Sequence, residues 1–150
     1  MAEINARGAA EIAAGRKVLF DSDGKSGTAV VEMPAVHAAA NGDTAGSGIV
    51  LPKGTRFLCP VTVSCAAGTA SATLSVGLRN PRTKAAIDAA ALVSAASISA
   101  AATAQVNTGT KLIGGQRYVL DQDAEIYLTF GGATPPANQA VRVEVGYIAA

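Results

Sequence analysis

The chain is poor in the side chains that most often carry chemistry. It has no tryptophan, three tyrosines, three phenylalanines, two cysteines and a single histidine among 150 residues. Aromatic residues amount to 4% of the chain, so few large flat side chains are available to line a ligand cleft. Much of the apolar content is alanine, which buries little surface. The composition therefore predicts a thin core and flat surfaces, suited to packing against copies of the same chain or a lattice.

Charge is scarce as well. Charged residues make up 15% of the chain, and the formal net charge is +1. Nucleic-acid-binding domains usually carry a basic patch or stripe, whereas Lys and Arg are scattered here. Only Arg79, Arg82 and Lys84 lie close together, around an expected turn. The sequence argues against nucleic acid as a partner.

No segment is typical of a membrane span or a signal peptide. The most apolar candidate, 85–104, is interrupted by Asp88 and by several serines, and its alanines are only weakly apolar. The first 17 residues lack the apolar core of a signal peptide. These features predict a protein made and folded in a cytoplasm, with no membrane partner.

Two loop segments match only part of a known ligand-binding motif. The Gly24-Lys25-Ser26 segment resembles the end of a phosphate-binding loop, but Leu19 stands where that motif needs a glycine. Asp21, Asp23 and Gly24 resemble the start of a calcium loop, but Lys25 stands at the third ligand position and no glutamate closes the loop. Both segments are better interpreted as turns.

The remaining candidates give no active site. His37 is the only histidine and has no cysteine near it in sequence, so neither a zinc site nor a hydrolytic triad is well supported. Glu32, Glu125 and Glu144 fall on the outward faces of expected strands, which predicts solvated carboxylates rather than a glycosidase pair. We expect no catalytic, cofactor-binding or metal-binding residues and no cofactor. A small hydrolase is the disfavoured alternative.

The two cysteines are expected on one strand. Cys59 and Cys65 are six residues apart, which places both on the same face at a separation of about 20 Å, too far for a disulfide between them. The favoured interpretation is a pair of buried thiols that act as small hydrophobic residues. An intersubunit disulfide is the alternative.

Strict alternation of apolar and polar residues predicts most of the strands. It is clearest over 56–65, where Pro60 indicates an edge or a bulge. An inward set is expected to form the core on two facing sheets. Its members are Leu74, Val76, Leu128, Phe130, Val143 and Val145. The expected strands are 17–20, 28–33, 48–51, 56–65, 72–79, 117–120, 126–130 and 140–148.

Turns and the remaining segments complete the expected fold. The segment 80–91, after Pro81, predicts one short helix, and 92–106 fits several states because it is rich in alanine and serine. The strand 117–120 is expected to pair with 126–130 through a tight turn at 121–124. The fold class is therefore all-β: an antiparallel β-sandwich, jelly-roll-like, with one short helix.

The N-terminus is expected to lie outside the sandwich. Residues 1–17 lack a strong apolar period, and only Ile4 and Ile12 are large and apolar. We interpret 1–17 as an N-terminal arm that is ordered mainly by contact with something else, and 18–150 as the β-sandwich domain.

From residue 51 onward the sequence resembles small virion proteins of tailed bacteriophages, of the capsid decoration or cement type. The segments that carry the resemblance are LPKGTR (51–56), ATLSVGL (72–78), ALVSAA (91–96), YVL (118–120), IYLTFGG (126–132) and AVRVEVGY (140–147). The resemblance lies in the order of strands, glycines and a short helix, not in a catalytic motif. It covers about two-thirds of the chain and implies no active site.

The resemblance implies a non-enzymatic structural protein on the capsid surface of a virion. Its partners would be the major capsid protein and further copies of itself, as a homotrimer, and it would be made in the cytoplasm of the host bacterium. The alternative is a tail or head-fibre component with a receptor- or glycan-binding role.

Overall fold

The structure is a computed structural model that describes residues 25–113 and 118–150. The expected arm 1–17, the domain boundary after it and the expected strand 17–20 lie outside the described residues. So do Leu19, Asp21, Asp23 and Gly24 of the two loop motifs.

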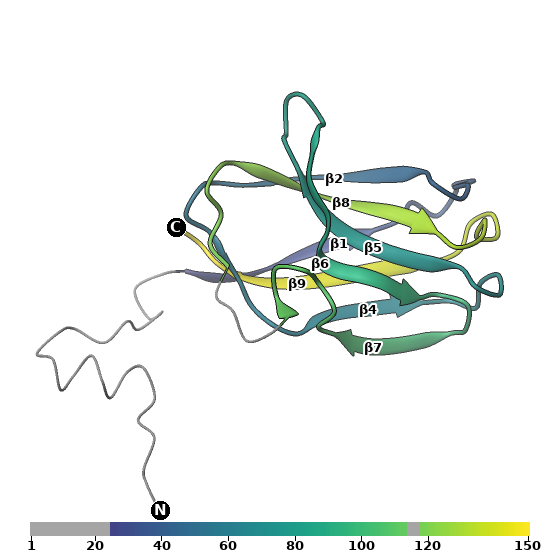
Figure 1. The fold of residues 1–150 in the computed structure, drawn as a ribbon. Coiled ribbons are helices and arrows are strands. Elements are labelled where there is room, and N and C mark those ends of the chain that lie inside the picture. The colour runs from purple at the N-terminus through teal and green to yellow at the C-terminus, as the bar shows by residue number, and fades with distance from the viewer. Residues whose placement is uncertain (1–24, 114–117) are drawn as a thin grey trace, which may run out of the picture.

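The described residues fold into nine β-strands and contain no α-helix. The strands form two antiparallel sheets that pack face to face (Figure 1). Their bounds are β1 Ser26–Glu32, β2 Thr44–Leu51, β3 Arg56–Phe57, β4 Val61–Cys65, β5 Thr73–Arg79, β6 Ala86–Ser97, β7 Ala102–Val106, β8 Ala124–Gly131 and β9 Val141–Ile148.

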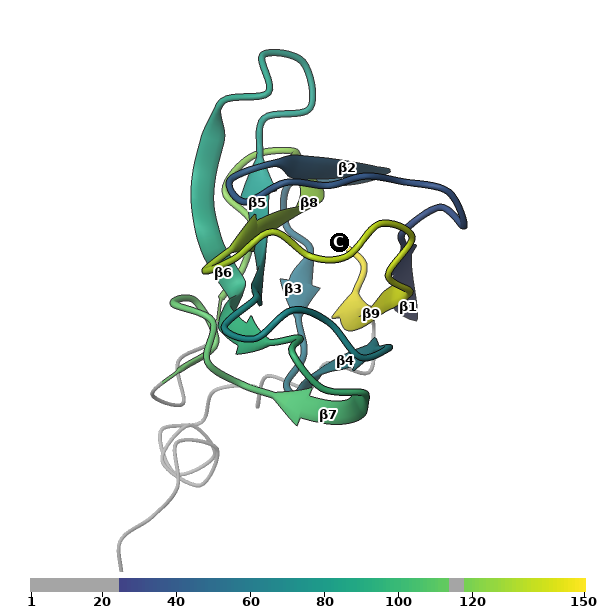
Figure 2. The same cartoon turned by 90° about the vertical axis from the view of Figure 1, so that its right-hand side faces the viewer.

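The strand order is that of a jelly roll. One sheet runs β1-β9-β4-β7, with the short β3 also pairing with β9, and the other runs β2-β8-β5-β6. When β3 and β4 are counted as one interrupted strand, the eight strands lettered B to I give sheets B-I-D-G and C-H-E-F. Figure 2 looks along the sandwich and shows the two layers end-on. The expected all-β sandwich is confirmed.

The core lies between the two inner faces, as the alternation predicted. Leu74, Val76 and Leu128 come from the β2-β8-β5-β6 sheet, and Val143 and Val145 face them from the other sheet. All five are fully buried, and Phe130 is 1% exposed. Branched aliphatic side chains fill most of the space, because the chain has few aromatic residues to do so.

The expected helix over 80–91 is wrong. Residues 80–85 turn the chain between β5 and β6, and the Asn80 side chain accepts hydrogen bonds from the backbone N–H groups of Arg82 and Thr83. The hairpin projects from the sandwich in Figure 1. Pro81 therefore belongs to a turn, where its fixed φ is equally favourable.

The strand β6 contains a wide bulge. Val76 pairs with Val93 and Leu78 pairs with Asp88. Two steps along β5 are therefore matched by five steps along β6. The bulge lies tightly over Gly77, where a Cβ atom would come within 2.6 Å of the carbonyl oxygens of Asp88 and Ala89. Glycine is required at this position by the close approach of the two backbones.

The strand expected over 56–65 is interrupted, which changes the environment of Cys59. A cis peptide bond joins Cys59 to Pro60, and Leu58, Cys59 and Pro60 lie between β3 and β4. Cys59 is exposed and Cys65 is half-buried, and both are free thiols. The prediction that both cysteines are buried is wrong, because the alternation does not continue through the proline.

The hairpin expected between 117–120 and 126–130 is also wrong. Val119 forms an isolated antiparallel bridge with Arg56, and β8 pairs instead with β2 and β5. The turn at 121–124 takes the chain from one sheet to the other. The segments 117–120 and 126–130 are therefore adjacent in sequence without being paired.

Replacing Leu128 by alanine should lower the free energy of unfolding by roughly 2–5 kcal/mol, because the lost side-chain atoms leave a cavity in the core. Denaturant titration followed by circular dichroism measures the change. Val50 on β2, with 48% of its surface exposed, is the matched control. Val50→Ala should change stability by no more than about 0.5 kcal/mol. An equally small effect of Leu128→Ala would contradict the assignment of this face to the core.

Candidate functional surfaces

The two ends of the sandwich differ in their side chains. One end is built by the loops 33–43, 66–72, 98–101 and 132–140, which consist mainly of alanine, glycine, serine, threonine and proline. Asp43 is the only Asp, Glu, Lys or Arg in these loops, and its carboxylate accepts a hydrogen bond from the backbone N–H of Ala40. Val36 in the first loop is 82% exposed. We call these four loops the small-residue end.

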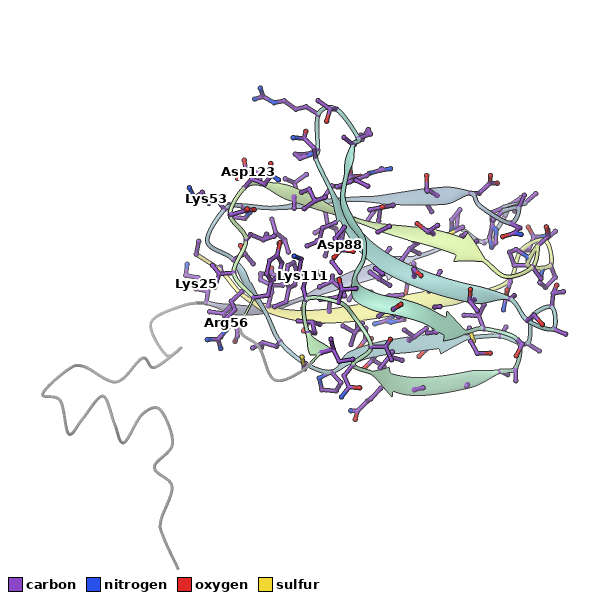
Figure 3. All side chains as sticks on the ribbon, in the orientation of Figure 1. Lys25, Lys53, Arg56, Asp88, Lys111 and Asp123 are labelled. Atoms are coloured by element: carbon purple, nitrogen blue, oxygen red, sulfur yellow. The ribbon has the colours of Figure 1, made fainter. Side chains whose placement is uncertain are left out.

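The opposite end carries the charge. In Figure 3 the labelled side chains of Lys25, Lys53, Arg56, Lys111 and Asp123 gather there. A small aromatic stack lies beside them, with the rings of Phe57 and Tyr118 6.3 Å apart and the Lys111 ammonium 5.3 Å from the Tyr118 ring centre. Burial, together with the negative charges of Asp121 and Asp88, raises the pKa of Tyr118.

Two side chains hold the small-residue end together. The buried Gln139 amide donates to the carbonyl oxygens of Ala66 and Ile98, at 2.8 Å each, and so links three loops. The Nε2 atom of His37 lies 2.7 Å from the carbonyl oxygen of Gln139, and the backbone N–H of His37 donates to the Asn138 side chain. His37 is therefore half-buried and connects two parts of the small-residue end, and its imidazole has no catalytic partner among these contacts.

An open groove of about 580 Å³ lies where the small-residue end meets the outer face of the β1-β9-β4-β7 sheet. Its walls include Met33, Cys65 and several alanines, with Glu32 and Arg142 at the side. The Arg142 guanidinium is 2.7 Å from Glu32 and 2.6 Å from Glu144. Both carboxylates are thus paired with the same cation. The groove lining includes no histidine to activate the Cys65 thiol.

The prediction of a solvated carboxylate is wrong for Glu125. This side chain is 3% exposed, on the face of β8 that points away from the core. Arg79 binds both carboxylate oxygens at 3.1 Å, and the Lys84 ammonium lies 2.5 Å from Oε2. The Arg79 guanidinium also lies over the Tyr127 ring, 5.1 Å from its centre. Glu32 is exposed as predicted, whereas Glu144 is half-buried, with 39% of its side chain exposed.

The chemistry of Glu125 is that of a structural ion pair. The hydrogen bonds from Arg79 are the largest cause that lowers its pKa, to about 2, with smaller contributions from Lys84 and the backbone of Gly48. A carboxyl group so acidic stays ionised near neutral pH and is a poor general acid. Through its ion pair with Lys84, Glu125 connects the β5–β6 hairpin to the outer face of β8.

The described residues offer no other reactive constellation. They contain no group of three or more His, Cys, Asp or Glu side chains that could hold a metal ion. No helix in the described part of the chain is both long and apolar enough to cross a membrane. Two of the tyrosines are used in packing: Tyr127 is buried under Arg79, and Tyr147 fills the space above Gly27.

Comparison with solved structures places the fold among chains of phage capsids. A chain in the capsid asymmetric unit of cyanophage Pam1 matches with a TM-score of 0.63 at 18% identity, over 85% of this chain and 86% of that one. A chain in the capsid of Ralstonia phage GP4 matches equally well, with a TM-score of 0.63 at 16% identity over 85% and 86%.

A chain in the acid-stable capsid of Helicobacter pylori bacteriophage KHP30 matches less well, with a TM-score of 0.48 at 16% identity over 82% and 86%. No protein-family model and no curated protein matches the sequence. At these identities the likeness is one of fold. The resemblance to phage virion proteins inferred from the sequence is confirmed at that level.

The ion pairs of Glu125 predict a defined pH dependence. The folded pKa lies below the ordinary value of 4.5. The ionised carboxylate therefore stabilises the fold above about pH 4.5, and this stabilisation is lost as the pH falls toward 2. Glu125→Gln should lower the free energy of unfolding at pH 7 by about 3 kcal/mol, because it leaves the nearly buried Arg79 without its counter-charge.

The difference between wild type and Glu125→Gln should shrink between pH 4.5 and pH 2, as measured by denaturant titration at several pH values. Glu144→Gln is the matched control, since that side chain is 39% exposed, against 3% for Glu125, and is also bonded to an arginine. Its effect should stay below about 1 kcal/mol. A pH-independent difference for Glu125→Gln would contradict the electrostatic account.

Proposed function

We propose that the protein is a structural component of a bacteriophage virion, of the capsid decoration type. It binds the outer capsid lattice and stabilises it, without enzymatic activity. The observation that carries the proposal is the extent of the fold likeness. The Pam1 and GP4 matches cover about the same large share of both chains. The likeness is therefore to whole chains of similar length in a capsid, rather than to one domain of a much larger subunit.

The surfaces of the molecule support an assembling role. A decoration protein needs a stable fold that presents broad, complementary surfaces, since specific interfaces bury about 1,000 Å² or more. The small-residue end presents short side chains on loops that Gln139 and His37 tie together, so few side chains lose rotamer freedom on docking. The opposite end presents charges, which favour selective recognition of one partner over others.

The attachment to the shell is proposed to involve the charged end. The described chain begins at Lys25, which lies at that end of the sandwich (Figure 3). We propose that the arm 1–17 and the charges at this end contact the major capsid protein. We propose that the copies form homotrimers, that they are made in the cytoplasm of the host bacterium and that they reside on the capsid surface.

The tail or head-fibre alternative is less well supported. A receptor- or glycan-binding module usually exposes aromatic side chains in a cleft. The groove beside the small-residue end is lined by no tyrosine or phenylalanine, and Tyr118 stacks on Phe57 at the charged end. The two roles differ most clearly in copy number.

Quantitative mass spectrometry of purified virions tests the proposal. The ratio of this protein to the major capsid protein should correspond to a decoration lattice, with copy numbers in the hundreds. The purified protein should also bind particles that lack it, and it should raise the temperature at which they open. A ratio that corresponds to only a handful of copies would reject the decoration role in favour of the tail.

Deleting residues 2–15 tests the arm. The variant should unfold at nearly the same temperature as the full chain, because the core comes from β1 to β9. It should bind undecorated particles more weakly or form trimers less readily, because the arm would supply part of the binding energy. Bound copies are counted by densitometry after sedimentation of the particles. Full occupancy at unchanged affinity would show that the arm is not an attachment device.

A further inference from the structure

The strand β7 forms an edge of its sheet that is open within the described structure. It pairs with β4 on one side, in an unshifted register from Val61 opposite Val106 to Cys65 opposite Ala102. On its other side no backbone hydrogen bond to a described residue is present. Figures 1 and 2 show β7 at the rim of the sandwich. Its first four residues are exposed, so neither face of this strand is covered.

Of the other three sheet edges, one is covered, one is bulged and one carries a charge. The backbone N–H groups of Thr110 and Lys111 donate to the carbonyl oxygens of Ala90 and Ala91, which covers the bulged part of β6. The edge of β2 is distorted by a bulge between Gly46 and Val50. The strand β1 ends in the charged residue Glu32. Covering, bulges and charges are the usual means by which proteins prevent edge strands from pairing.

The strand β7 has none of these devices. Its sequence is Ala102-Thr103-Ala104-Gln105-Val106, without a charge, a proline or a bulge. Unpaired backbone N–H and C=O groups on such an edge are a template for one more strand. A strand with this chemistry at a bare edge is a docking site for another extended backbone.

The pattern of side chains along β7 is symmetric about its centre. Val61 and Val63 are buried on the inner face, and their partners Val106 and Ala104, together with Ala102, share that face. Thr103 and Gln105 lie on the outer face, where the Thr103 hydroxyl accepts a hydrogen bond from Ser64. The order is therefore apolar, polar, apolar, polar, apolar, and it is the same in either direction.

We propose that β7 pairs antiparallel with β7 of a second copy of this chain, around a two-fold axis at Ala104. All five residues then find a partner: Ala104 faces Ala104, Thr103 faces Gln105 and Ala102 faces Val106 of the other copy. Apolar residues stay on the inner side, polar residues stay on the outer side, and no like charges face each other. This self-complementarity favours a second copy over an unrelated strand as the occupant.

The pairing would join two sandwiches into one continuous sheet, in the order β1-β9-β4-β7-β7-β4-β9-β1. A two-fold contact of this kind is isologous and differs from the head-to-tail contacts of a trimer. It could therefore link copies that belong to different trimers on a shell. Five residues make a small interface, so the contact is weak in solution and gains strength when many copies are held side by side. The inference does not depend on the proposed capsid role, because it can be tested on the purified protein.

Disulfide trapping tests the pairing and its register. In a background with Cys59→Ser and Cys65→Ser, Ala104→Cys would place two thiols directly opposite each other, with Cβ atoms about 4.5–5.5 Å apart. This is near the range in which a disulfide can close with small backbone shifts. Ala102→Cys is the matched control, because it changes another exposed alanine on the same face of β7. Its two thiols would be displaced by four residues, or about 13 Å.

Under mild oxidation at about 0.5 mM protein, where a weak small interface is partly occupied, Ala104→Cys should give a covalent dimer on a non-reducing gel. The yield should exceed that of Ala102→Cys by about tenfold or more, since only opposed thiols can close. A mixture of Ala102→Cys with Val106→Cys should restore the cross-link. Equal yields from the two alanine positions, or no dimer from Ala104→Cys, would overturn the proposal.

A charge test without introduced cysteines gives an independent answer by analytical ultracentrifugation. Thr103→Lys with Gln105→Lys should abolish self-association, because lysines then face each other twice. Thr103→Lys with Gln105→Glu should restore it, because each lysine then faces a glutamate. Thr28→Lys with Val30→Lys, at two exposed positions of β1 on the opposite edge of the same sheet, adds two charges away from β7 and should leave association unchanged. The same association state in all three variants would also overturn the proposal.

Discussion

The alternation of branched aliphatic side chains on the two inner faces is the constraint on which the rest of the structure depends. Residues such as Val76, Leu128 and Val143 are fully buried between the sheets, while their sequence neighbours point outward. With few aromatic residues to fill space, the core remains a single layer between two sheets. The inner faces of the strands form this core. The features that distinguish the molecule therefore lie at its two ends and at its sheet edges.

Those ends and edges have different physical character. The small-residue end is made rigid by Gln139 and His37, and it can approach a partner surface closely with little loss of side-chain entropy. The charged end offers electrostatic selectivity. The edge at β7 offers backbone hydrogen bonds. A protein that contacts neighbours on several sides needs several such surfaces, and this combination is consistent with the proposed place on a virion shell.

Glu125 shows how a rare charge is used in a chain with so few of them. Its burial would be costly without a partner, and Arg79 and Lys84 supply two. The result is a fixed connection between the outer face of β8 and the projecting hairpin. Glu125 also shows that an acidic residue on a strand can have a third role besides catalysis and solvation, as the buried partner of an ion pair.

Several features of this protein were determined locally and could be predicted from the sequence. A period of two residues depends only on neighbouring side chains, so the strands around Leu74, Leu128 and Val143 and their inward faces were identified correctly. For the candidate surfaces, composition pointed to small residues and packing, without indicating where on the molecule they would gather.

Other features were decided only by the tertiary structure. Residues 80–97 fit a helix or a strand locally, and the pairing of β6 with β5 over Gly77 selected the strand. The burial of Glu125 depends on Arg79, 46 residues earlier, and Cys59 is exposed because its strand is interrupted at Pro60. Whether a strand lies at an edge depends on the order of the whole sheet. Contacts between residues far apart in sequence leave no local pattern, which is why sequence alone could not reveal them.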